Sequence, residues 1–331
     1  MGKREAMATV YVFEDKNRTF GAFWESDAGV PLMFLPHYSR VATEMSKLHW
    51  EAVGARHNSD LYDANFPELH NLAKWSFGAN GIEVDLSSVS ELITPMGCFN
   101  PRVWRGIPAS PGFGGYEGVA PSPLIYSSRK QATVAATSLF SGLVELFRYV
   151  EPSSTNDQCF GHRARELLIL ACTEVESHWK GVLLQNMKNP PTPSFKPVTK
   201  DYIKLAPILR LKDWRVMLRD YFGYRLIAPF EHWDTAKPSQ SLEWYSAYNA
   251  VKHDREGKFE QAQIQFVIEA MAAVHVMLAA QWGPEIHSNS FTGGFSPFQI
   301  ISMPTYAANE QYVCPSAQDK IVLNQAIPFG I

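Results

Sequence analysis

The sequence predicts a mainly α-helical fold, a four-helix bundle with small β-containing flanks on its N- and C-terminal sides. Two observations support this fold class. Four stretches after residue 126 carry apolar residues at helical spacing, and prolines or glycines lie at their ends. A length of 331 residues, with 46% apolar and 19% charged residues, is typical of a globular protein with a sizeable core.

The N-terminal flank is expected to be irregular. Residues 8–35 alternate short β-prone runs with turns, which indicates two or three strands, and residues 36–95 contain helical pieces. Residues 96–124 are rich in glycine and proline, so we expect a loop there. Its glycines lack the spacing of a phosphate-binding loop. We therefore assign residues 1–125 to an irregular α/β region.

The bundle is expected over residues 126–283, with an insertion at residues 190–240. Within the insertion, residues 211–222 are expected to form a short helix. The tail, residues 284–331, contains β-prone runs that we expect to pair with the N-terminal strands and to pack on the rest of the chain. The four helices of the bundle are expected at residues 127–150, 157–187, 242–256 and 259–282.

Composition restricts the classes of function. With a net charge of −3, any nucleic acid or anionic membrane partner would need a local basic patch. The four cysteines form no C-x-x-C pair, which argues against a zinc knuckle or a disulfide framework and favours a reducing compartment. The most apolar window, residues 266–280, is interrupted by Glu269 and His275 and is too short to span a bilayer. We expect a cytoplasmic protein that does not enter the membrane.

The third expected helix carries a polar stripe beside its apolar one. At about 100° per residue, Tyr248 falls on the apolar stripe, whereas Asn249 and His253 lie on the neighbouring stripe with Lys252 close to Asn249. An imidazole exchanges protons near neutral pH, and an amide and an ammonium can hold an anionic oxygen. Histidine and charged residues are also ordinary in the last turn of a helix, so a solvated helix end is the alternative.

The segment "YNAVKH", residues 248–253, resembles the Arg-Asn-x-x-x-His motif of HEPN domains, which are helical bundles. Asn249 and His253 match the motif, whereas Tyr248 stands where the family has arginine. A second trait of some HEPN groups, Glu-x-x-x-Lys on the preceding helix, matches Glu176 and Lys180 as supporting residues. The resemblance covers about residues 127–282 and implies a HEPN-like four-helix bundle. The amino-acid sequence of these helices also resembles that of a group of bacterial proteins.

Many HEPN proteins are metal-independent endoribonucleases of toxin-antitoxin or phage-defence systems, and they act as homodimers. The resemblance implies that His253 is the acid-base group for attack of a ribose 2′-hydroxyl on the adjacent phosphate, and that Asn249 orients it. Tyr248 cannot supply the positive charge of the family's arginine, so Lys252 is the candidate substitute at the phosphate. A catalytically inactive module that dimerises or binds a partner is the alternative. An antitoxin or a nucleotidyltransferase is a further expected partner.

The insertion offers a second candidate surface. Residues 196–225 carry eight lysines or arginines against three aspartates, interleaved with aromatic residues. This combination suits phosphate contacts and base stacking, and hence RNA, while a solvated amphipathic helix with inward aromatic residues is the alternative. The candidate RNA-binding residues are Lys204, Arg210, Lys212, Arg215 and Arg219.

No metal site and no cofactor are expected. Glu174 and His178 are one helical turn apart and could touch a metal ion, but the paired Glu-x-x-His spacing of di-iron bundles does not occur. At least one of Glu174 and Glu176 is expected near the bundle interior, in an ion pair or as an orienter of His253.

Overall fold

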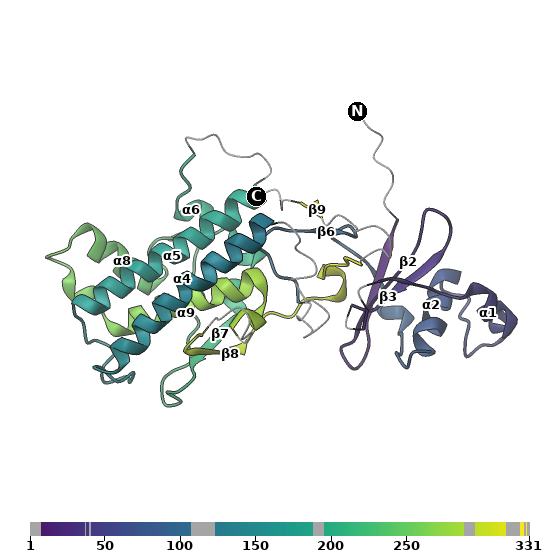
Figure 1. Cartoon of the computed structure of the whole chain (residues 1–331), viewed down its shortest axis with the longest axis horizontal. Coiled ribbons are helices and arrows are strands. Elements are labelled where there is room, and N and C mark those ends of the chain that lie inside the picture. The colour runs from purple at the N-terminus through teal and green to yellow at the C-terminus, as the bar shows by residue number, and fades with distance from the viewer. Residues whose placement is uncertain are drawn as a thin grey trace. The chain divides into compact units, whose positions relative to one another are not determined.

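The computed structural model describes residues 8–36, 38–39, 41–106, 123–187, 195–287, 295–315, 325–327 and 329 (Figure 1). Contacts between the described residues divide the chain into two compact units. We call them the sheet unit, within Met1–Phe99, Arg105–Val119 and Tyr306–Ala326, and the helical unit, within Asn100–Trp104, Ala120–Thr305 and Ile327–Ile331.

The sheet unit contains a five-stranded antiparallel sheet in the order β4-β3-β2-β1-β5. Successive side chains of a strand point to opposite faces, and both faces of this sheet are covered. Phe13 and Phe23 lie on one face, and Val12 lies on the other face with Val313 from the C-terminal segment. The strands are β1 (Val10–Glu14), β2 (Phe20–Glu25), β3 (Pro31–Phe34), β4 (Thr43–Glu44) and β5 (Ser90–Glu91).

Two helices, α1 (Lys47–Ala52) and α2 (Glu68–Gly78), contribute to the phenylalanine-bearing face of the sheet. Phe77 of α2 packs edge-on against Phe13, with 4.7 Å between ring centroids. The short strands β6 (Cys98–Phe99) and β9 (Gln325–Ala326) pair in parallel within the same unit. Its 3₁₀ turns are η1 (Ala55–His57), η2 (Leu86–Ser88) and η6 (Ala308–Glu310).

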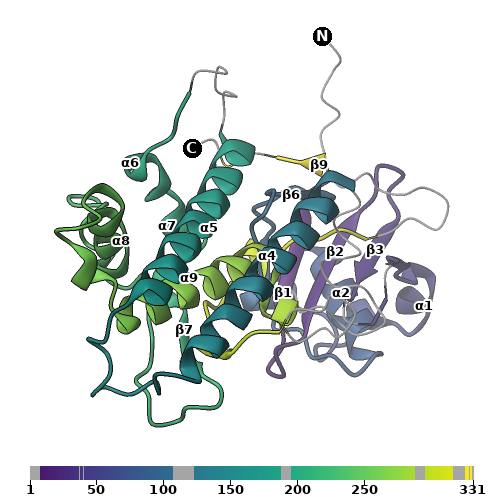
Figure 2. The ribbon, with the colours of Figure 1, turned by 60° about the vertical axis from the view of Figure 1, so that its left-hand side comes forward.

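The helical unit contains the four long helices that the sequence predicts. Figure 2 shows α4, α5 and α9 side by side, and α8 contacts α5 and α9. Nearly every side chain of α9 is buried, as expected of a helix that is apolar on all sides. The helices of this unit are α4 (Pro123–Phe147), α5 (His162–Asn186), α6 (Thr199–Tyr202), α7 (Leu205–Ile208), α8 (Glu243–His253) and α9 (Ile264–Trp282), with 3₁₀ turns η3 (Leu211–Asp213), η4 (Phe259–Gln261) and η5 (Pro284–His287).

Among the described helices, α9 has the length and composition to cross a membrane. Of its apolar window, 83% is buried inside the protein. Its apolar character is therefore explained by its place in the core.

The helix predicted at residues 211–222 is wrong. The segment forms the turn η3 and then strand β7 (Arg215–Leu218), which pairs antiparallel with β8 (Phe298–Ser302). Val216 and Leu218 are buried while Arg215 and Met217 are half-buried, and this period of two is that of a strand. The C-terminal run that contains β8 was expected to pair with N-terminal strands, and it pairs with β7 instead.

The predicted fold class, a mainly α-helical HEPN-like four-helix bundle, is also wrong. The chain is 44% helical and 12% strand, and the five-stranded sheet together with the helices makes it a mixed α/β protein. The β-prone runs of residues 8–35 are not a small flank, because they join β4 and β5 in a sheet with its own core on each face. Short segments such as β4 and β5 carry too little pattern to be recognised from sequence.

Candidate functional site

The apolar stripe predicted on α8 is confirmed. Trp244, Ala247, Tyr248 and Val251 are all buried. Tyr248, which occupies the arginine position of the motif, is 1% exposed, and its ring lies 5.5 Å from that of Tyr245. An aromatic ring is well accommodated in this buried position, whereas a buried arginine would need a charged partner.

Lys252 contacts Tyr248, which lies one helical turn earlier on α8. Its Nζ donates a hydrogen bond of 2.7 Å to the Tyr248 hydroxyl and lies 4.8 Å from the centre of the Tyr248 ring. The hydrogen bond to Tyr248, with a further contribution from the charge of Glu176, raises the pKa of Lys252 above its usual value. The contact therefore gives an otherwise exposed ammonium a defined position on α8.

Asn249 and His253 lie further out. Asn249 is half-buried, and His253 is exposed as the last residue of α8. Among the described contacts, neither side chain takes part in a hydrogen bond or an ion pair. The structure thus brings Tyr248 and Lys252 into contact and leaves the amide and the imidazole open to a ligand.

The two supporting residues on α5 differ in their surroundings. Glu176 is half-buried and accepts a 2.6 Å hydrogen bond from the Tyr245 hydroxyl. Burial, with this hydrogen bond to Glu176, raises the pKa of Tyr245, so Tyr245 stays neutral. Lys180 is exposed, and no ion pair between Lys180 and Glu176 occurs in the described part of the chain. Glu176 therefore joins α5 to α8 through Tyr245.

The candidate RNA-binding residues of the insertion do not form one exposed basic face. Arg215 is paired with Glu231 at 2.8 Å, and Arg210 donates to the backbone carbonyl of Thr305. Two aromatic residues of the insertion point inward, since Trp214 is fully buried and Tyr224 is 7% exposed with its hydroxyl donating to Asp157. Of the five candidates, Lys204, Lys212 and Arg219 are exposed, and the aromatic Phe222 near them in the sequence is exposed as well.

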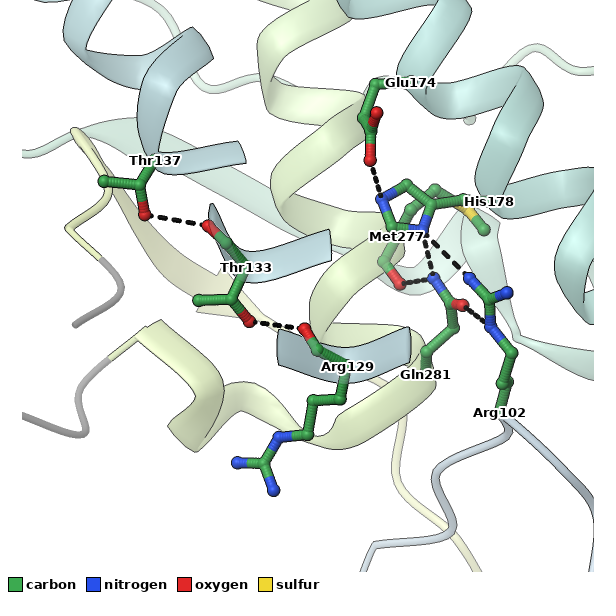
Figure 3. A network of polar contacts seen from close by, with 8 residues as sticks. All are labelled: Arg102, Arg129, Thr133, Thr137, Glu174, His178, Met277 and Gln281. Atoms are coloured by element: carbon green, nitrogen blue, oxygen red, sulfur yellow. Dashed lines mark hydrogen bonds and ion pairs between the residues drawn. The ribbon is translucent and has the colours of Figure 1, made fainter. Parts of the chain in front are cut away.

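A buried polar network lies elsewhere in the helical unit (Figure 3). Arg102, which is 9% exposed, donates from Nε to Gln281 Oε1 at 2.6 Å, and its Nη2 lies 3.2 Å from His178 Nδ1. Gln281 Nε2 lies 3.1 Å from the same Nδ1 and also donates to the Met277 carbonyl. His178 Nε2 lies 3.4 Å from Glu174 Oε1, without the geometry of a full hydrogen bond.

The network fixes the protonation of its members. Two donors converge on Nδ1 of His178, so Nδ1 is the acceptor and the ring proton sits on Nε2, towards Glu174. Burial and the charge of Arg102 lower the pKa of His178 to about 3, and burial lowers the pKa of Arg102 to about 10. Burial raises the pKa of Glu174, against the opposing effect of Arg102.

The network acts in packing, because it is largely closed to solvent: His178 and Gln281 are buried, Arg102 is 9% exposed, and 22% of the Glu174 side chain is exposed. The sequence shows that Glu174 and His178 share a helix face, but not that Arg102 lies beside them. Arg102 is 76 residues from His178 and 179 from Gln281, and its backbone has a φ of +56°.

Within α4 of the same unit, the side-chain hydroxyls of Thr133 and Thr137 donate hydrogen bonds to backbone carbonyls one turn earlier.

Comparison of the chain with protein-family models, curated proteins and solved structures gave no match. Within the described residues, no three His, Cys, Asp or Glu side chains come together in an arrangement that could hold a metal ion.

Proposed function

We propose that this chain is a HEPN-like RNA-binding protein that binds and cleaves RNA at the end of α8 without a metal ion. The observation that carries the proposal is the hydrogen bond from Lys252 to Tyr248. It holds an ammonium on the turn of α8 that carries half-buried Asn249 and exposed His253. The pair of Tyr248 and Lys252 replaces the motif's arginine, with Lys252 supplying the charge.

The proposed reaction uses only these side chains and a second copy of the chain. His253 takes the proton of a ribose 2′-hydroxyl while that oxygen attacks the adjacent phosphorus and the bond from phosphorus to the 5′-oxygen breaks. The departing oxygen takes a proton from His253 of the second copy in a homodimer, and a 2′,3′-cyclic phosphate remains. Lys252 and Asn249 hold the phosphate oxygens as their charge increases.

A catalytically inactive HEPN-like module is the second candidate, and one observation favours it. Tyr248 is buried and cannot contact a phosphate with its ring, and the ammonium of Lys252 is already in contact with that ring. Under this alternative, the end of α8 binds a second copy or a partner protein. The two candidates differ in one measurable property, the cleavage of RNA.

The test incubates the full chain with end-labelled single-stranded RNA in excess EDTA. We expect cleavage by the unmodified protein, a loss of about 100-fold or more in rate for His253→Ala, and a loss of about 10²–10³ for Lys252→Ala. His232→Ala is the matched control, since His232 is an exposed histidine of the same unit, and it should cleave at the unmodified rate. Inert protein that forms a tight dimer would support the second candidate instead.

The proposal also includes a cytoplasmic location and a partner encoded beside the chain, an antitoxin or a nucleotidyltransferase of a toxin-antitoxin or phage-defence system. Co-purification of the tagged chain with the product of a neighbouring gene is the expected result. A chain that purifies alone and is not inhibited by any neighbouring gene product would contradict this part.

A further inference from the structure

A cluster of two aromatic rings and two basic side chains lies on the surface where α5 begins. We call it the α5 surface cluster, and it consists of Phe160, His162, Arg165 and Phe259. The ring of Phe259 lies 5.7 Å from that of Phe160 and 4.8 Å from that of His162, and the guanidinium of Arg165 lies 5.4 Å from its centre. Phe160 is 53% exposed and His162 is exposed, whereas Arg165 and Phe259 are half-buried, so the cluster meets solvent mainly through Phe160 and His162.

The backbone around the α5 surface cluster is held in place. Phe160 forms a β-bridge with Gln263, and Ile264 donates from its backbone nitrogen to the Cys159 carbonyl at 2.8 Å. His162 and Arg165 belong to the first turn of α5, a helix that extends to Asn186. A backbone held in this way loses little further conformational freedom when a flat ligand stacks on the side chains that it carries.

The cluster is joined to the proposed site by a short segment of chain, residues 254–258. Phe259 begins η4, which contacts α8 and follows it directly in the chain. The connection is a tight turn, because Asp254 accepts hydrogen bonds from the backbone nitrogens of Gly257 and Lys258. A strand of nucleic acid at His253 would therefore reach Phe259 within a few nucleotides.

The charges of the cluster suit an anionic strand. Arg163 is neutralised by Glu145 and Glu166, at 2.8 and 2.9 Å. Among the described ion pairs none involves Arg165, whose guanidinium lies over the ring of Phe259. Basic residues in a first helical turn face the positive end of the helix dipole, so a phosphate there relieves their repulsion.

We propose that the α5 surface cluster stacks the bases of the single-stranded RNA whose backbone is held at the end of α8. The inference rests on the proposed function and names its substrate class, unpaired RNA. Exposed Phe160 supplies the face on which a base stacks, half-buried Phe259 supports the Phe160 ring edge-on, and His162 and Arg165 contact the neighbouring phosphates. This proposal places base stacking at the α5 surface cluster instead of at the insertion, where Trp214 and Tyr224 are buried.

The test measures the affinity of the full chain for single-stranded 2′-O-methyl RNA, which binds but lacks the attacking hydroxyl. We expect Phe160→Ala to weaken binding about tenfold and Phe160→Tyr to restore it. Phe295→Ala is the matched control, a phenylalanine of 51% exposure, and should bind like the unmodified chain. An RNA with abasic positions should bind the unmodified chain and Phe160→Ala equally weakly.

The outcomes separate the two proposals. If the unmodified chain binds RNA and Phe160→Ala binds it equally well, base stacking at this cluster is refuted, and the function at α8 stands. If the unmodified chain binds no RNA, the proposed function fails, and this inference fails with it. Preference for double-stranded over single-stranded RNA, or binding of a protein partner that Phe160→Ala abolishes, would also overturn the inference.

Discussion

Replacing Gly181 with alanine tests the packing of the Arg102 network. Gly181 lies within α5, where an exposed glycine-to-alanine change would stabilise a helix by about 1 kcal/mol. Here a β-carbon would stand 1.8 Å from Arg102 Nη1 and 2.6 Å from its Cζ. The guanidinium would have to leave its place, although it is the far end of a flexible side chain.

The size of the effect follows from what Arg102 would lose. It would give up its hydrogen bonds to Gln281 and His178 inside the core, and since a hydrogen bond of a charged group contributes about 1.5–3 kcal/mol, the two together contribute about 3–6 kcal/mol. After subtracting the helix-propensity gain of about 1 kcal/mol, we expect Gly181→Ala to be less stable by about 2–5 kcal/mol.

Urea denaturation followed by circular dichroism measures this difference. Gly78→Ala is the matched control, because a β-carbon at Gly78 of α2 would meet nothing within 4 Å. In an Arg102→Leu background the collision is gone, so adding Gly181→Ala should be neutral or stabilising. A Gly181→Ala single variant as stable as the unmodified protein, or more stable, would refute the assigned packing.

Three further predictions concern stability. His275 and His287 are stacked with 3.7 Å between ring centroids, and burial lowers both pKa values, that of His287 to about 4. In the unfolded chain both histidines bind a proton near the ordinary pKa of about 6.5, whereas in the folded chain they bind it only at lower pH. The free energy of unfolding should therefore fall as the pH drops from about 6.5 towards 4. In acid titrations it should fall less steeply for His287→Phe. Tyr245→Phe removes the hydrogen bond to Glu176 and should lower stability by about 1–3 kcal/mol in urea. Asn71 is fully buried and donates hydrogen bonds to backbone carbonyls of the preceding loop. Asn71→Ala should therefore destabilise the protein by about 1–3 kcal/mol and speed hydrogen exchange in α2 and that loop. Unchanged exchange would contradict this prediction.

The long helices could be predicted from sequence because each carries its own signal. The period of apolar residues locates α4, α5, α8 and α9, and it identifies the buried stripe of α8 that includes Tyr248. The exposure of His253 is harder to predict from sequence. The angle of about 100° per residue gives the direction of a side chain around the helix, but not the residue at which the helix ends. The helix ends at His253, three residues before the expected end at 256.

The remaining features depend on contacts between distant segments. The segment that forms β7 becomes a strand by pairing with β8, whose residues lie 80 to 87 positions later in the chain. Without β8 in view, the same segment is predicted to be a short helix. Arg102 lies in a loop rich in glycine and proline, and nothing local indicates that its side chain enters the core beside Gly181. Such long-range pairings are set by tertiary packing, which propensity and periodicity do not describe.

The most direct test of the central claim is the chemistry of the RNA ends produced in EDTA. If the end of α8 cleaves RNA through His253, the unmodified chain should leave 2′,3′-cyclic phosphate and 5′-hydroxyl ends, and His253→Ala should leave the RNA intact while remaining folded. Ends with a 3′-hydroxyl and a 5′-phosphate, or undiminished cleavage by His253→Ala, would contradict the account.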